Sequence, residues 1–166
     1  MCLESAYYDT CIFLASLNDD HQESEACGRL LDVPRISWTV SLCPELSAGE
    51  SAAQEYIQRF EIECASHGVE LMPVAPAAAA ATSKKHLGLK KLLVQRGFGA
   101  RDWKHLMAAA TADAKVLLTV DPDFWDPRNK AQPDARRRVV EVKKAIESCL
   151  PLKIRLPSEA IDACCR

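Results

Sequence analysis

The chain has 166 residues, of which 48% are hydrophobic and 27% are charged, and its formal net charge is -2. This balance is typical of a globular protein with a substantial core, and we expect residues 1–166 to form a single domain. No aliphatic run is long enough to cross a membrane, and no basic segment followed by an apolar one opens the sequence. We therefore expect a cytoplasmic protein with no membrane partner.

The eight cysteines are scattered along the chain without a C-x-x-C pair. Structural zinc sites need clustered ligands, and disulfide frameworks belong to exported proteins. We therefore expect most of these thiols to be small buried hydrophobes. Cys11 lies close to a candidate acid, Asp9, but no histidine stands at a local spacing that would make it a nucleophile.

Strand and helix patterns alternate along the whole chain. We expect strands at 5–9, 36–41, 69–75, 115–120 and 152–156, and helices at 10–17, 21–31, 44–66, 76–97, 102–113 and 139–149. The run at 115–120 is aliphatic without alternation, as in a strand covered on both faces, and Pro73 favours an edge position for the third strand. The alternation predicts an α/β fold with three layers, α/β/α, around a mainly parallel central sheet.

Several acids fall at positions where strands end or helices begin. Asp9 follows the first strand, Glu45 opens the helix after the second, and Asp121 follows the aliphatic strand, with Asp123 two residues further on. Asp102 begins the helix that leads into that strand. Because ligands bind beyond the carboxyl ends of the strands in an open parallel sheet, we expect these acids to share one cleft.

Each of these acids also has an ordinary structural explanation, as a helix cap, a turn former or a charge at the positive end of a helix. Their combination favours a metal site, because gathered carboxylates repel one another unless they are protonated or bridged by a cation. Ligands that are all oxygen select Mg²⁺ or Mn²⁺ over zinc. Such a site can activate water for attack on a phosphodiester.

A basic stretch runs directly into Asp102. Its members are Lys84, Lys85, Lys90, Lys91, Arg96, Arg101 and Lys104. These cations could hold a nucleic acid across an acidic cleft, whereas a charge run more commonly marks a solvated helix face. Both interpretations remain open at this point.

Five short motifs occur in an order that resembles the PIN-domain family, the metal-dependent ribonucleases that include the VapC-type toxins. The motifs are Asp9-Thr10, Glu45-Leu46, Asp102 with His105-Leu106 and the alanines that follow, Thr119-x-Asp121-x-Asp123-Phe124, and Leu156-Pro157-x-Glu159. The resemblance spans nearly the whole chain. Two departures are Cys11, where asparagine is common after the first motif, and Pro44 before the glutamate.

The resemblance implies a PIN-like α/β/α fold and a Mg²⁺- or Mn²⁺-dependent endoribonuclease. It makes Asp9, Glu45, Asp102 and Asp121 the catalytic and metal-binding acids, Asp123 an auxiliary metal ligand, and Thr10 and Thr119 supporting hydroxyls. It also implies an RNA substrate, a cognate antitoxin and a homodimer as partners.

Two other functions belong to different classes. A non-catalytic RNA-binding or regulatory PIN-like module would be marked by the loss of an acid, but all four are present. Aspartyl phosphotransfer with Asp9 as nucleophile would need a second aspartate two residues later, where the chain has Cys11. None of the four histidines has a paired ligand at helical spacing, so we expect structural or surface roles for His21, His67, His86 and His105.

Overall fold

The computed structural model describes residues 5–16, 18–30, 32, 39–42, 51–125 and 135–165. Its sheet has five strands in the order β3-β2-β1-β4-β5. These strands are β1 (Ala6–Tyr8), β2 (Thr39–Leu42), β3 (Glu70–Pro73), β4 (Val116–Leu118) and β5 (Lys153–Arg155). All four pairings between them are parallel, which confirms the expected parallel sheet. The third strand lies at an edge, as Pro73 predicted.

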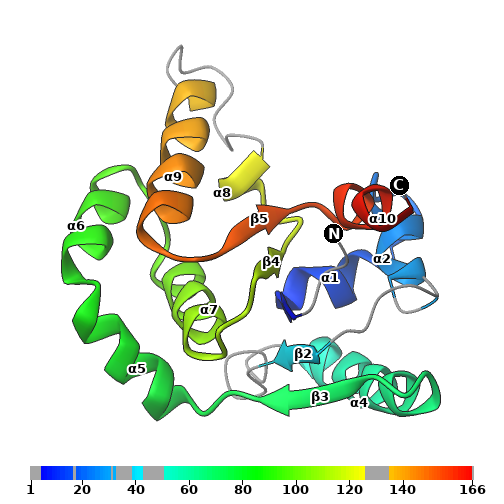
Figure 1. Cartoon of the computed structure of the whole chain (residues 1–166). Helices are drawn as coiled ribbons and strands as arrows, with labels where there is room; N and C mark the ends of the chain where they lie inside the picture. The colour runs from blue at the N-terminus through cyan, green and yellow to red at the C-terminus, as the bar shows by residue number, and fades with distance from the viewer. Residues whose placement is uncertain are drawn as a thin grey trace.

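Helices cover both faces of this sheet (Figure 1). The described helices are α1 (Thr10–Ala15), α2 (Ser24–Arg29), α4 (Ser51–Ser66), α5 (Pro76–Lys85), α6 (Leu87–Gln95), α7 (Ala100–Thr111), α8 (Pro122–Trp125), α9 (Ala135–Cys149) and α10 (Pro157–Cys165). In Figure 1, α5, α6, α7 and α9 lie to the left of the sheet, and α1, α2, α4 and α10 lie to its right. The three-layer α/β/α architecture expected from the sequence is therefore confirmed.

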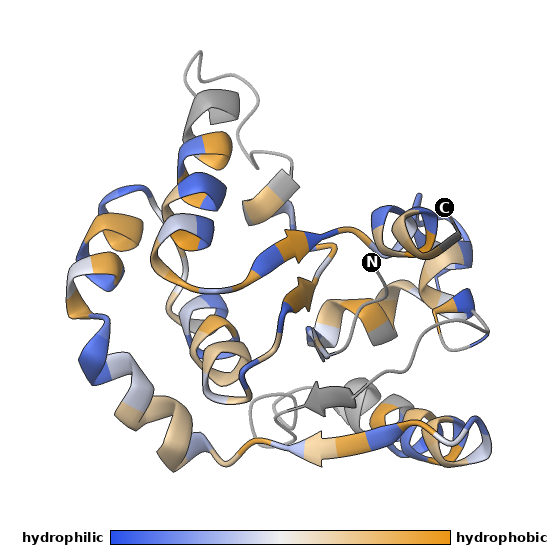
Figure 2. Cartoon of the chain, in the orientation of Figure 1, coloured by the Kyte–Doolittle hydropathy of each residue, from blue (hydrophilic) through white to orange (hydrophobic). Residues whose placement is uncertain are grey.

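Alternation along β1 and β4 divides the core between these two layers. Tyr7 and Leu117 belong to the cluster that also contains Met107 of α7 and Ile146 of α9. Tyr8 and Leu118 belong to the cluster with Ile12 of α1 and with residues of α2, α4 and α10. All residues of β4 are buried, as an aliphatic strand in the middle of a sheet requires. Figure 2 shows β4 as hydrophobic along its length, whereas β5 at the edge alternates between hydrophobic and hydrophilic residues.

Several element boundaries differ from those predicted. The helix expected at 76–97 is divided at His86, whose backbone (φ -115°, ψ 31°) is not helical. Gly97 has a φ of 81°, which lets the chain leave α6 and turn back into α7. The short helix α8 and the terminal helix α10 were not among the helices predicted. Of the strand expected at 36–41, residues 36–38 lie outside the described part of the chain.

Most of the cysteines whose thiols the structure describes behave as small buried hydrophobes, whereas Cys149 is exposed and Cys11 is half-buried. Cys27, Cys64 and Cys164 are buried, and their thiols are free. Burial raises the pKa of both Cys27 and Cys64 to about 12. Within the described part of the chain, no helix combines the length and the apolar character needed to cross a bilayer.

Candidate functional site

Asp9 lies at the carboxyl end of the central strand. It directly follows β1, its side chain is buried, and its backbone N–H donates to the carbonyl of Leu118 at 3.0 Å. From β1 the chain adds β2 and β3 on one side of the sheet, and it then adds β4 and β5 on the other side. The order of the strands therefore switches between β1 and β4. A parallel sheet opens its ligand crevice at such a switch point. Asp9 therefore stands where this fold would bind a ligand.

Both oxygens of the Asp9 carboxylate are in contact with donors. Oδ2 accepts a hydrogen bond of 2.8 Å from the hydroxyl of Thr119, which follows β4 and is fully buried. Oδ1 lies 3.5 Å from the backbone nitrogen of Cys11, so that Asp9 also caps α1. The Thr119 hydroxyl in turn accepts from the backbone N–H of Asp121 at 3.0 Å. One hydroxyl thus joins two of the predicted acids.

The Cys11 thiol is part of the same cluster. Its Sγ lies 3.3 Å from Oγ1 of Thr119 and accepts from the backbone N–H of Val120, also at 3.3 Å. Burial and then the negative charge of Asp9 raise the pKa of this thiol well above its usual value. Cys11 is therefore a neutral packing and hydrogen-bonding group, which agrees with the rejection of a thiolate nucleophile.

Asp102 lies in the first turn of α7, although it is not the cap. The N-cap is Gly99, which makes Asp102 the third helical residue. A Cβ atom added to Gly99 would lie 2.5 Å from Oδ2 of Asp102, so the carboxylate folds back over the glycine backbone. Its charge is favourable at this positive end of the helix.

An aromatic contact brings the start of α7 towards the segment after β4. The rings of Phe98 and Phe124 meet edge to face, with centroids 5.3 Å apart at 78°. Phe98 lies just before α7, and Phe124 donates its backbone N–H to the carbonyl of Asp121 at 3.0 Å. The two segments that carry Asp102 and Asp121 are therefore packed together beside the crevice.

His105, for which the sequence predicted a structural or surface role, lies beside Asp9. It is buried on α7, its Nδ1 lies 2.9 Å from the hydroxyl of Tyr7, and its Nε2 lies 4.0 Å from Oδ1 of Asp9. Three residues turn a helix by about 300°, which is only about 60° in the opposite sense, so Asp102 and His105 share a face. That spacing was the signal in the sequence.

The structure does not bring a complete metal site together within its described residues. Among these residues, no three His, Cys, Asp or Glu side chains lie close enough to hold an ion. Glu45 lies outside the described residues, and so does the side chain of Asp123. Thr10 is buried at the start of α1. The carboxylate oxygens of the predicted ligands would suit Mg²⁺ or Mn²⁺. The four-carboxylate site stays a prediction.

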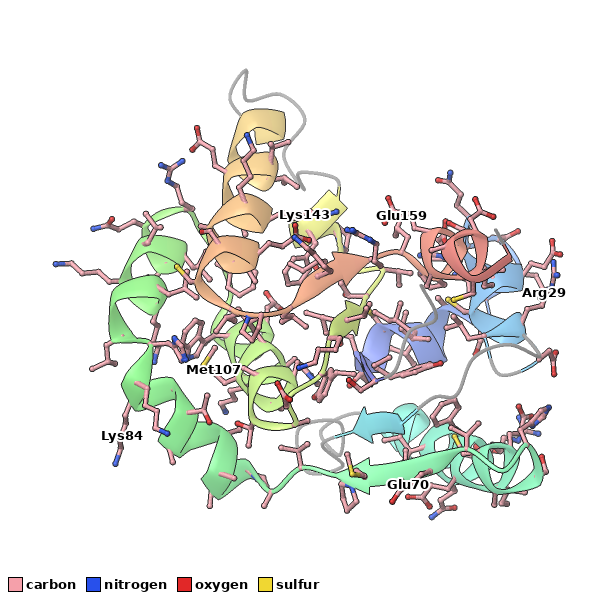
Figure 3. The ribbon with its side chains drawn as sticks, viewed as in Figure 1. Arg29, Glu70, Lys84, Met107, Lys143 and Glu159 are labelled. Carbon is pink, nitrogen blue, oxygen red and sulfur yellow. The ribbon has the colours of Figure 1, made fainter. Side chains whose placement is uncertain are left out.

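The predicted nucleic-acid contacts differ in exposure. Lys84 and Lys85 end α5 and are exposed, as are Lys91 and Lys104, while Lys90 is half-buried. Figure 3 shows Lys84 projecting outward from α5, away from the rest of the molecule. Arg96 forms an ion pair with Glu141 of α9, and the side chain of Arg101 lies outside the described residues.

Comparisons with known proteins bear on the fold. No family profile and no curated protein matches the sequence. A crystal structure of VapBC2 from Rickettsia felis bound to a DNA fragment from their promoter contains a similar chain, with a TM-score of 0.51 and 15% identity. The similarity covers 92% of the present chain and 98% of the other. At this identity the likeness concerns the fold alone, and it agrees with the PIN-like α/β/α architecture expected from the sequence.

Proposed function

We propose that this chain is a Mg²⁺- or Mn²⁺-dependent endoribonuclease of the PIN-domain, VapC-like type that hydrolyses RNA phosphodiester bonds. The observation that carries the proposal is the Asp9 carboxylate, buried at the switch point of the sheet and held by the hydroxyl of Thr119 at 2.8 Å. A carboxylate held in this place can serve as a metal ligand, because the ligand crevice of a parallel sheet opens at its switch point.

The acids of the crevice would bind the ion, and a neighbouring hydroxyl would orient two of them. Asp9 and Asp121 would hold the ion together with Glu45 and Asp102, with Asp123 as an auxiliary ligand, while Thr119 fixes two of these residues relative to each other. When bound, a divalent ion supplies charge neutralisation at the leaving oxygen and activates water. The buried end of the sheet limits the rotation of Asp9, so the ligand geometry is set before RNA arrives.

The proposal extends to partners. The structurally similar chain belongs to a VapBC2 assembly, which supports the idea that this chain is the toxin of a toxin-antitoxin pair with a cognate antitoxin. The PIN-domain resemblance of the sequence adds a homodimer to the proposal. The exposed lysines of α5 and α6 would bind the phosphates of an RNA that extends to the crevice. Such contacts favour binding because they release the counterions that surround the phosphates.

The test is cleavage of a mixed single-stranded RNA pool with Mn²⁺, with Mg²⁺ or with EDTA. We expect cleavage with either ion, none with EDTA, and none by Asp121→Asn under any condition. Asp113→Asn is the matched control, because Asp113 is an exposed aspartate before β4, at the opposite end of that strand. RNA binding without metal-dependent cleavage would favour the non-catalytic RNA-binding module instead.

A further inference from the structure

A buried polar chain runs from β1 through α7 to the Asp9 carboxylate. Tyr7 and His105 are both almost completely inaccessible to solvent, and the Tyr7 hydroxyl lies 2.9 Å from Nδ1 of His105. Their rings meet edge to face, with centroids 6.0 Å apart at 63°. Beyond this pair, Nε2 of His105 faces Oδ1 of Asp9 at 4.0 Å. The proposed metal chemistry assigns no task to either residue.

The surroundings of the imidazole favour one tautomer. A neutral imidazole has one N–H donor and one acceptor nitrogen, and a tyrosine hydroxyl can donate to the acceptor. If the Tyr7 hydroxyl donates to Nδ1, the proton of His105 lies on Nε2, the nitrogen that faces Asp9. The other tautomer would direct a lone pair at a carboxylate in a site of low dielectric, which is unfavourable. The electrostatic consideration selects the Nε2–H form, and donation by the Tyr7 hydroxyl to Nδ1 is compatible with it.

This placement also gives Asp9 electropositive groups around both of its oxygens. Thr119 donates to Oδ2, whereas Oδ1 faces the Cys11 backbone nitrogen and His105. The contact with His105 is longer than a hydrogen bond, so it acts through electrostatics on the orientation of the carboxylate. A leucine would fill the space under α7 without the cost of burying a polar ring, so packing alone does not account for a histidine.

We propose that Tyr7 and His105 are positioning residues for Asp9: Tyr7 holds the imidazole with its proton on Nε2, and that N–H restrains the rotation of the carboxylate that would bind the metal. The metal part of this inference rests on the proposed function, whereas the tautomer does not. Groups that orient a ligating carboxylate typically change metal affinity by about 10- to 100-fold when they are removed.

The tautomer is tested on the full chain without metal. Long-range ¹H–¹⁵N correlation spectra of ¹⁵N-histidine-labelled protein, recorded where the imidazole is neutral, distinguish the two forms, and His105→Gln assigns the resonance. We expect the Nε2–H form for His105. Finding the Nδ1–H form would overturn the proposal, because the ring would then present a lone pair to Asp9.

The positioning role is tested by Mn²⁺ affinity, measured by electron paramagnetic resonance. We expect Tyr7→Phe and His105→Met to bind Mn²⁺ about 10-fold more weakly than the wild type, and His105→Gln, whose amide can still donate towards Asp9, to recover part of the loss. Tyr8→Phe is the matched control, since it removes an equally buried hydroxyl from the opposite face of β1.

The outcomes separate this inference from the proposed function. Unchanged Mn²⁺ affinity in both Tyr7→Phe and His105→Met would overturn the positioning role while leaving the metal site intact. A wild type that binds no Mn²⁺ would overturn the proposed function and the metal part of this inference, and the spectra would still decide the tautomer. An equal loss in Tyr8→Phe would reduce the effect to general packing and contradict the specific role of Tyr7.

Discussion

The hydroxyl of Thr119 donates a hydrogen bond of 2.8 Å to Oδ2 of Asp9, across 110 positions of the sequence. The two residues follow β4 and β1, which are neighbours in the sheet. Because the same hydroxyl accepts from the backbone of Asp121 at 3.0 Å, it fixes the carboxylate and the turn after β4 together. Removing it should disturb both partners at once.

Thr119→Val keeps the shape of the side chain and removes this hydroxyl. The buried carboxylate of Asp9 loses a donor, so we expect the free energy of unfolding to fall by about 1–3 kcal/mol. Metal-dependent RNA cleavage should fall as well. Urea unfolding and cleavage measure the two effects, and Thr119→Ser, which retains the hydroxyl, serves as the control. Wild-type cleavage by a folded Thr119→Val would show that this hydrogen bond is irrelevant to the site.

Gly99→Ala should displace the Asp102 carboxylate without straining the backbone. Gly99 has a φ of -72°, which suits alanine, but the new Cβ would come within 2.5 Å of Oδ2 of Asp102. We expect slower metal-dependent cleavage by a variant that still folds, as circular dichroism would confirm. Gly88→Ala is the control, because a Cβ there would meet no atom within 4 Å. Equal cleavage by both variants would mean that the orientation of Asp102 does not matter.

Glu23 should contribute strongly to stability, because it caps a helix distant in sequence. Its buried carboxylate accepts from the backbone N–H of Ser158 at 2.9 Å and from the Ser158 hydroxyl at 2.8 Å, at the start of α10. We expect Glu23→Ala to lower the free energy of unfolding by about 1–3 kcal/mol.

The matched control for Glu23 is its near neighbour Glu25. Glu25 forms an ion pair with Arg29 at the surface, with a side chain that is 84% exposed. Glu25→Ala should cost less than about 1 kcal/mol. Denaturant unfolding of both variants provides the comparison, and equal losses would contradict a capping role for Glu23.

The lysines of α5 and α6 should bind RNA if the basic stretch forms the RNA path. Replacing Lys84, Lys85, Lys90 and Lys91 by alanine should weaken RNA binding and flatten its dependence on salt concentration. Lys115 and Lys153 are the controls, because they lie at the amino ends of β4 and β5 rather than at the crevice. Equal salt dependence in the lysine variant and the wild type would remove this stretch from the RNA path.

Local sequence patterns were enough to predict much of the fold. A strand that is buried on both faces is aliphatic along its length, which identified the run before Thr119 as a central strand. Proline lacks a backbone N–H donor, so Pro73 predicted an edge strand. The placement of Asp9 and Thr119 at neighbouring strand ends follows from the same parallel sheet.

Contacts between distant segments were harder to predict. The cap of α10 depends on Glu23, which lies 135 positions earlier, and no local pattern marks that contact. The sequence predicted a structural or surface role for His105, but its contacts with Tyr7 and Asp9 could not be predicted, because these partners come from β1 and its end. Aspartate is a common N-cap, which led to the prediction that the helix begins at Asp102. In the structure α7 begins at Ala100 with Gly99 as its N-cap, and Phe98 before it packs on Phe124.

The most direct test of the proposed site is the rate at which Asp9→Asn cleaves a mixed single-stranded RNA pool in the presence of Mn²⁺. Asparagine keeps the shape of the side chain and an oxygen that can accept from Thr119, but it removes the charge that a metal ligand requires. We predict no cleavage above the metal-free background by a variant with the circular dichroism spectrum of the wild type. Cleavage at the wild-type rate would contradict a metal-dependent nuclease site at the end of β1.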